Sequence, residues 1–355
     1  MVARKALLIG SMPYDSEQTA MTRALDTVGP YLFSLPDGEI GEITEMYPKG
    51  KRSAWVLTQI NQCAADKENF KVIKNLVRNK EGFPVDYKHL EKLKPLHSPA
   101  ELDKHLDLGY YTYFKSSYEI FKKLREEKNL PNLKFQVGVP TGLGISFIMM
   151  QPVDAFQYAN AFNRRIAYEV RQIIAEAGDD VIFQVEIPAE LALAYMLPVL
   201  GSIIGVGQVK ALVKLLPATA KVGVHLCLGD LNNEALTKAK TLNTMVAFSN
   251  KLIAAWPLPE PPLYVHYPLA EAADPPRLDA PYYAPLQDIK LPPGTDFVAG
   301  FVHEKLNAEQ GRQILKAIED VRGKPVGIAC SCGMGRRDTP IADSLLEKMK
   351  EVAAS

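Results

Sequence analysis

Two short stretches of the chain carry pairs of residues whose side chains bind transition metals. KVGVHLCLGD contains His225 and Cys227 two positions apart, and KPVGIACSCG contains Cys330 and Cys332. On an extended strand, residues two apart point to the same face. Imidazole and thiolate are ligands that Zn²⁺ prefers, in structural and in catalytic sites. Each pair alone is a weak signal, because a single buried cysteine commonly behaves as a small hydrophobe.

The pattern of apolar runs predicts the elements that must position these pairs. Eight short runs rich in β-branched and aromatic residues end in turn residues and predict strands, at 5–13, 31–39, 134–142, 181–188, 221–230, 261–269, 296–304 and 324–333. Helical patterns lie between most of them; one covers 154–177 and stops before Gly178. Strand–helix alternation repeated in this way is typical of a (β/α)8 TIM barrel. A doubly wound open sheet is the alternative, but the first strand is followed by no dinucleotide-binding glycine motif.

The length suits one large barrel. We expect residues 1–355 to form a single (β/α)8 barrel domain. Residues 40–130 are too long for one crossover helix, and we expect a helical insertion, or lid, between strands two and three that leans over one mouth of the barrel.

The composition is that of an ordinary globular protein. It is 47% hydrophobic, and 41 basic residues balance 41 acidic ones. This balance argues against a nucleic-acid partner and against binding to an anionic membrane surface. The first apolar run is too short for a signal peptide or a membrane span, and four cysteines do not make a disulfide framework. A cytoplasmic location is therefore expected.

Polar residues gather where the predicted strands end, which is where (β/α)8 barrels carry their active sites. The candidates at these positions are Ser11, Glu39, Thr141, Glu186, His225, Cys227, His266, His303, Glu304, Cys330 and Cys332. The first halves of the same runs carry almost no such residues, so we expect one site at one end of the barrel.

These residues and their order resemble the catalytic barrel of cobalamin-independent methionine synthase, within the uroporphyrinogen decarboxylase/methionine synthase-like superfamily. The Ile-Gly-Ser run ending at Ser11 and the Gly-Glu pair ending at Glu39 match family motifs that hold an amino-acid substrate. The run QVEIP matches the family's strand-four motif, and Glu186 takes the place of a carboxylate that contacts the substrate amine.

The resemblance also implies a zinc site. Its ligands would be His225, Cys227 and Cys332. A glutamate that ligates zinc in the family falls near His266, so either His266 or Cys330 could be the fourth ligand.

The activity implied is transfer of a methyl or other alkyl group to a small homocysteine-like thiol, which zinc activates as a thiolate. His303 matches a histidine thought to move protons in the family, and it would protonate the leaving group. Arg336 and Arg337 follow strand eight and would clamp an anionic part of a substrate, although they could equally be solvated or helix-capping arginines.

One departure concerns the alkyl donor. The family's strand-three motif supplies a tryptophan that stacks on folate, and Ile145 stands at that position here. The sequence therefore does not predict folate as the donor.

Two other functions remain open. One is a metal-independent decarboxylase or lyase of the same superfamily, which would leave the histidine and cysteines without a joint task. The other is a non-catalytic zinc-binding barrel, for which a closed site with four protein ligands would be typical. We expect a monomer or a homodimer.

Overall fold

The computed structural model describes residues 4–53 and 55–355, and parallel strands form its central sheet. The eight strands of this sheet are β1 (Ala6–Leu7), β2 (Ser34–Pro36), β5 (Lys134–Pro140), β6 (Val181–Glu186), β7 (Lys221–His225), β8 (Tyr264–Pro268), β9 (Asp296–Val302) and β10 (Gly327–Cys330). The strand order is β1-β10-β9-β8-β7-β6-β5-β2. The Phe33 N–H donates to the Ala6 carbonyl (3.0 Å) and nearly closes the sheet into a barrel. Each strand lies within a predicted run, and the predicted (β/α)8 fold is confirmed.

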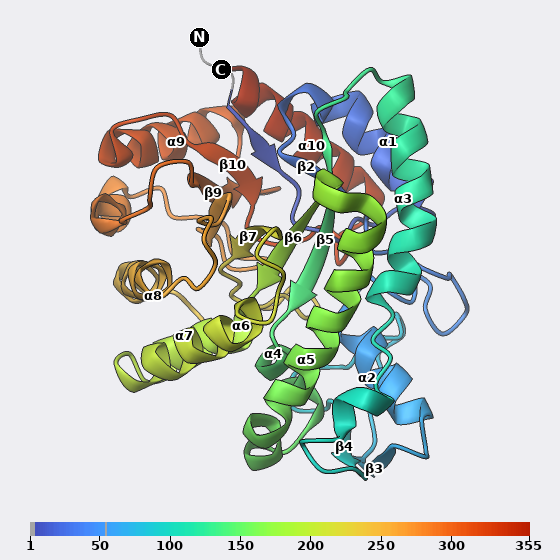
Figure 1. Cartoon of the computed structure of the whole chain (residues 1–355). Coiled ribbons are helices and arrows are strands. Elements are labelled where there is room, and N and C mark those ends of the chain that lie inside the picture. Colours follow the sequence, from blue (N-terminus) through green and yellow to red (C-terminus); the bar gives the residue numbers. More distant parts are fainter. Residues whose placement is uncertain (1–3, 54) are drawn as a thin grey trace.

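Helices surround the strands (Figure 1). The outer helices are α1 (Glu17–Val28), α3 (Tyr110–Glu127), α5 (Pro152–Ala177), α7 (Leu200–Val213), α8 (Asn243–Ala254), α9 (Ala308–Arg322) and α10 (Thr339–Ala354). Two shorter helices follow β5 and β6: α4 (Gly142–Met149) and α6 (Pro188–Met196). Among the helices described, none combines the length and the apolar character needed to cross a membrane.

Local chemistry explains where these helices begin and end. Helix α5 has Pro152 in its first turn, where the missing N–H costs nothing, and Gly178 follows its end with a φ of 62°. Its buried face includes Phe162 and Ile166. After β8 the outer position is taken by the 3-10 helix η4 (Ala280–Asp288), which contains Pro285 and so cannot form a regular α-helix there.

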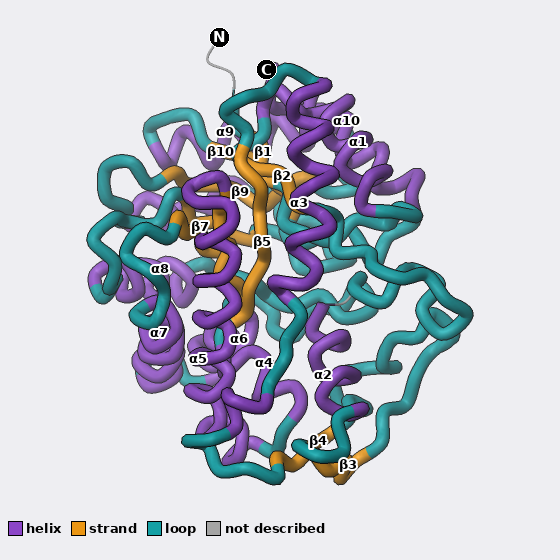
Figure 2. The backbone as a smooth tube through the Cα atoms, turned by 45° about the vertical axis from the view of Figure 1, so that its right-hand side comes forward, coloured by secondary structure: helices purple, strands orange, loops and turns teal. Residues whose placement is uncertain are grey.

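The predicted insertion lies between β2 and β5 and holds more than helices. It contains α2 (Trp55–Ala65), an antiparallel pair made of β3 (Phe70–Lys74) and β4 (Lys92–Pro95), and the 3-10 helix η2 (Leu102–His105). Figures 1 and 2 show α2, β3 and β4 at the end of the barrel toward which β5 and β6 run. The insertion therefore lies over the carboxyl ends of the strands.

A layer of polar side chains fills the barrel beneath that end. The Gln136 and Gln184 side-chain amides donate to the Ile9 carbonyl at 3.0 and 2.6 Å. The Tyr264 hydroxyl donates to Gln184 Oε1 (3.1 Å), and Gln184 Nε2 also donates to Glu186 (2.9 Å). Buried polar groups are costly unless hydrogen-bonded. This layer therefore supports Glu186 from below and gives the barrel floor a defined packing.

We predict that Gly223→Ala destabilises the protein by about 1–3 kcal/mol, the range for overpacking a core. A methyl group at this position of β7 would overlap the Tyr264 ring and displace its hydroxyl from Gln184. Urea unfolding measures the effect. Gly311→Ala in α9 is the control, because nothing lies within 4 Å of its added methyl group. Equal stability of the Gly223→Ala variant and the parent would contradict the packing described here.

Candidate active site and metal centre

A cavity lies at the carboxyl ends of the strands and brings most of the predicted site residues together; with the open space at its mouth included, its volume is about 840 Å³. The predicted residues that line it are Ser11, Glu39, Glu186, Cys227, Cys332 and Arg336. Apolar side chains form much of the remaining wall, among them Leu57 and Leu90 from the insertion and Phe147 and Ile148 from α4. A mostly apolar pocket with a few convergent polar groups is typical of a small-molecule site.

A histidine and two cysteines cluster at this cavity. The Cys227 and Cys332 sulfurs lie 3.9 Å apart, and a ring nitrogen of His225 joins them so that all three ligand atoms lie within 4.8 Å of one another. His225 is fully buried, and its Nε2 has no hydrogen-bond partner among the residues described. Two thiols that lose their protons supply two negative charges, which suits a divalent ion. The residues present therefore fit zinc.

The strand ends explain which cysteine reaches the cluster. His225 is the last residue of β7, and Cys227 follows two positions later. Strand β10 ends at Cys330 with an irregular register between Ala329 and Cys330. The chain then bends, so the two-residue alternation of a strand does not extend to Cys332: Cys330 packs in the apolar core, whereas Cys332 belongs to the candidate metal-ligating group.

Two members of the cluster have shifted pKa values in the metal-free protein. The hydrogen bond with Cys227, together with burial, raises the pKa of the Cys332 thiol well above its usual value. Burial lowers the pKa of His225 well below its usual value. Both shifts favour the neutral form of the side chain.

Glu39 and Glu186 form a second group at the cavity. A methyl group added to Gly138 would lie 3.2 Å from Glu39 Oε1 and 3.0 Å from Glu186 Oε1, so both carboxyl groups lie over the same residue. A strained turn presents Glu39: its φ is 51°, a left-handed conformation that non-glycine residues rarely adopt, and its N–H donates to Asp37 Oδ1 (2.9 Å). The Arg52 guanidinium holds Asp37 in turn, at 2.8 Å.

Burial raises the pKa of Glu39 to about 8, and the Glu186 carboxylate adds to the shift. Two carboxyl groups this close cannot both ionise cheaply unless a cation lies between them. The pair therefore suits an ammonium group.

Arg336 lies across the cavity and is tied to Ser11. Arg336 Nη1 donates to Ser11 Oγ (2.9 Å), and the Gly335 N–H reaches the same oxygen at 3.3 Å. Arg336 Nε is buried and has no partner among the residues described. The Arg336 guanidinium can thus donate this N–H to an anionic group of a ligand.

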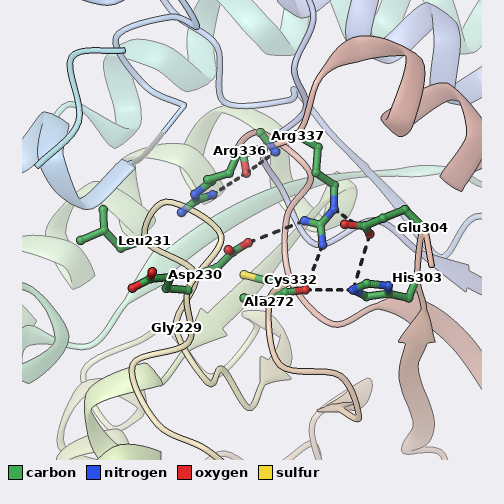
Figure 3. Close-up of polar contacts among 12 residues, drawn as sticks. Gly229, Asp230, Leu231, Ala272, His303, Glu304, Cys332, Arg336 and Arg337 are labelled. Atoms are coloured by element: carbon green, nitrogen blue, oxygen red, sulfur yellow. Dashed lines mark hydrogen bonds and ion pairs between the residues drawn. The ribbon is translucent and has the colours of Figure 1, made fainter. Parts of the chain in front are cut away.

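Arg337 points away from Arg336 and belongs to an ion-pair network (Figure 3). Its Nε donates to Glu304 Oε2 (3.0 Å), its Nη2 donates to the Ala272 carbonyl (3.3 Å), and its Nη1 lies 3.9 Å from Asp230 Oδ2. It is not among the residues that line the cavity. Arg337 thus ties three loops together and is engaged away from the cavity, where Arg336 alone of the two arginines forms part of the wall.

Two predicted histidines also lie off the cavity wall. His303 Nε2 donates to the Ala272 carbonyl (3.0 Å), and its Nδ1 accepts from the Lys305 N–H (3.1 Å), so both ring nitrogens are occupied (Figure 3). His266 lies behind His225, with its Nδ1 2.7 Å from His225 Nδ1 and its Nε2 3.0 Å from the Cys330 carbonyl. The structure brings neither imidazole to the position expected of a proton donor or fourth ligand.

Asp230 and Tyr87 line the cavity and were not predicted. Asp230 is 4% exposed, and neither carboxylate oxygen has a hydrogen-bond partner among the residues described. Burial raises its pKa to about 6. Gly229 and Asp230 are the last residues of the predicted run 221–230, and an acid just past a barrel strand is itself a signal. The Tyr87 hydroxyl accepts from the Leu231 N–H (3.0 Å), but nothing in its local sequence distinguishes it.

Comparisons with known proteins support the fold. No protein-family model matches the sequence, and no curated protein matches it. Among solved structures, the chain is similar to a B12-independent methionine synthase from Shewanella sp. W3-18-1, solved in complex with selenomethionine, with a TM-score of 0.61. The identity is 13%, and the match covers 99% of this chain and 98% of that chain. The structural relationship expected from the sequence is confirmed at the level of the barrel.

We predict that Glu39→Gln flattens the pH dependence of stability in metal-free protein. Because the pKa of Glu39 is raised, the folded parent keeps a proton that the unfolded chain releases, so its free energy of unfolding falls as pH rises from about 4.5 to 8. The variant lacks this titrating carboxyl group. Between pH 5 and pH 8, its free energy of unfolding should therefore fall by about 1–3 kcal/mol less than that of the parent. Urea titrations at both pH values test this, with the exposed Glu127→Gln as control. Parallel pH profiles for the Glu39→Gln variant and the parent would contradict the prediction.

Proposed function

We propose that the protein is a zinc-dependent transferase that moves a methyl or other small alkyl group to the sulfur of an amino-acid thiol. One observation carries the proposal: a buried imidazole nitrogen without a partner among the residues described lies with two thiols at a cavity that Glu39, Glu186 and Arg336 also line. A metal site, a cation site and an anion site thus share one pocket.

His225, Cys227 and Cys332 would hold the zinc ion. When bound, Zn²⁺ supplies positive charge that keeps a thiol deprotonated at neutral pH while the sulfur stays nucleophilic. The B12-independent methionine synthase of similar fold supports this chemistry by analogy, and its selenomethionine ligand is an alkylated selenium amino acid.

The other polar groups select the substrate. Glu39 and Glu186 bind an ammonium group, which relieves the repulsion between their carboxylates. Arg336, with the hydroxyl of Ser11 beside it, binds a carboxylate. An α-amino acid with a short thiol side chain presents all three groups, so a homocysteine-like thiol is the proposed acceptor.

The reaction is a displacement at carbon. The thiol releases its proton to solvent, the sulfur forms a bond to the donor's alkyl carbon, and the broken bond leaves its electron pair on the donor. The chain's part is to orient both molecules and to exclude water with the apolar wall that includes Leu57, Leu90 and Phe147. Ile145 is fully buried and does not line the cavity, so it does not offer the stacking surface that the family's tryptophan gives to folate.

The cavity also favours catalysis over zinc storage. A storage or structural site is closed by its protein ligands. Here Cys227 and Cys332 line an open pocket of about 840 Å³.

We predict about one zinc ion per chain in protein purified without chelator, and none in the Cys227→Ser variant, because a hydroxyl replaces a preferred thiolate ligand. Elemental analysis measures the metal. Alkyl transfer to homocysteine from a panel of methyl donors should fall with the zinc content. Cys63→Ser is the matched control, since Cys63 is buried in α2 and lies outside the metal-ligating group. A metal-free variant that retained full activity would falsify the proposal.

A further inference from the structure

We infer that His266 does not bind the metal but holds His225 in the one tautomer that can, which leaves three protein ligands and one open coordination position. This inference rests on the proposed zinc site and assigns a positioning residue that departs from the four-ligand expectation. Three groups carry it: the carbonyl oxygen of Cys330 in β10, the imidazole of His266 in β8 and the imidazole of His225 in β7.

The direction of the hydrogen bonds follows from the carbonyl group. A carbonyl oxygen can only accept, so His266 Nε2, 3.0 Å from the Cys330 oxygen, carries a hydrogen. Both imidazoles are fully buried, and a charge buried without a counter-ion is costly, so each ring carries a single hydrogen. His266 Nδ1 is therefore a bare acceptor.

The direction of the hydrogen bond between His225 and His266 follows from this. His225 Nδ1 lies 2.7 Å from His266 Nδ1, so His225 must donate and its single hydrogen is on Nδ1. This leaves a lone pair on His225 Nε2. That nitrogen is the ring atom without a partner among the residues described, and His225 is the histidine that groups with Cys227 and Cys332. A ligating histidine commonly has its other nitrogen fixed in this way.

The same chain of bonds removes His266 from the ligand set. One of its nitrogens faces the Cys330 carbonyl and the other faces His225, so no lone pair remains for the ion. Cys330, the other candidate, lies in the apolar core. A zinc site with three protein ligands is typical of catalysis, because the fourth position accepts water or substrate.

Gly300 makes room for this arrangement. A methyl group added to Gly300 in β9 would overlap His266 Nε2 and lie 2.8 Å from its Cε1. Gly300→Ala should therefore push His266 off the Cys330 carbonyl while leaving every metal-ligating residue in place. This variant perturbs the positioning without deleting an imidazole.

Zinc competition with a chromophoric chelator, on the full chain, tests the positioning role. His266→Ala and Gly300→Ala should each weaken zinc binding by about 10- to 100-fold while still binding one ion at saturation. His266→Gln should recover part of the loss, because an amide offers both an acceptor and a donor. Gly207→Ala, whose added methyl group meets nothing within 4 Å, is the control. Circular dichroism checks that each variant is folded. Unchanged zinc affinity in folded His266→Ala and Gly300→Ala proteins would overturn the inference.

X-ray absorption of the zinc-loaded parent counts the ligands directly. The inference expects two sulfur neighbours and one imidazole, with a third sulfur after addition of homocysteine. Two imidazoles on the ion would overturn it and leave the proposed function standing. One imidazole and two sulfurs without any alkyl transfer would support the inference and remove the proposed function. Absence of zinc would overturn both.

Discussion

The register between neighbouring strands is the constraint on which the site depends. In the parallel pairing of β6, β7 and β8, Glu186 lies opposite His225, and His225 lies opposite His266. Side chains at one level of neighbouring barrel strands point the same way. A shift of one residue in β7 would turn His225 toward the outer helices and separate it from both neighbours. The pairing of the sheet thus sets the position of the metal site, and the loops add Cys227, Cys332 and Asp230 around it.

The unmatched polar groups show where a ligand belongs. Below the cavity, the amide layer of Gln136 and Gln184 is bonded to carbonyl groups and to Tyr264. Around the cavity, by contrast, His225 Nε2, Arg336 Nε and both oxygens of Asp230 are buried without hydrogen-bond partners among the residues described. Leaving such groups without hydrogen bonds costs free energy, roughly 1–3 kcal/mol each. Arg336 and Asp230 line the cavity and His225 groups with its two cysteines, which supports the proposal that a metal ion and a polar substrate bind there.

Regular patterns made the fold and half of the site predictable from sequence. Short apolar runs ending in turn residues located the eight strands, and their ends located residues such as Glu39 and Cys227. What the sequence could not reveal depends on the direction in which a side chain points after its strand has ended. Cys330 and Cys332 differ because β10 ends at Cys330 and the chain bends before Cys332, and Arg337 and His303 turn toward Ala272 rather than the cavity. The insertion was expected to be helical, yet two of its segments, with Phe70 and Leu93 buried, pair as strands β3 and β4.

In the proposed zinc site, His266 stands at the end of β8, where the family that the sequence resembles has a ligating glutamate, and this difference would change the charge at the metal. Two thiolates and a glutamate would give an occupied zinc site a net charge of −1, whereas two thiolates and the neutral His225 would give zero. An incoming thiolate would therefore be repelled less by the proposed site, and the Arg336 guanidinium at the same cavity would add attraction. The buried position of His266 has a further effect, since a second neutral imidazole behind His225 adds no charge while fixing its orientation. Lower charge and an open coordination position both favour a thiol as the molecule that completes the centre.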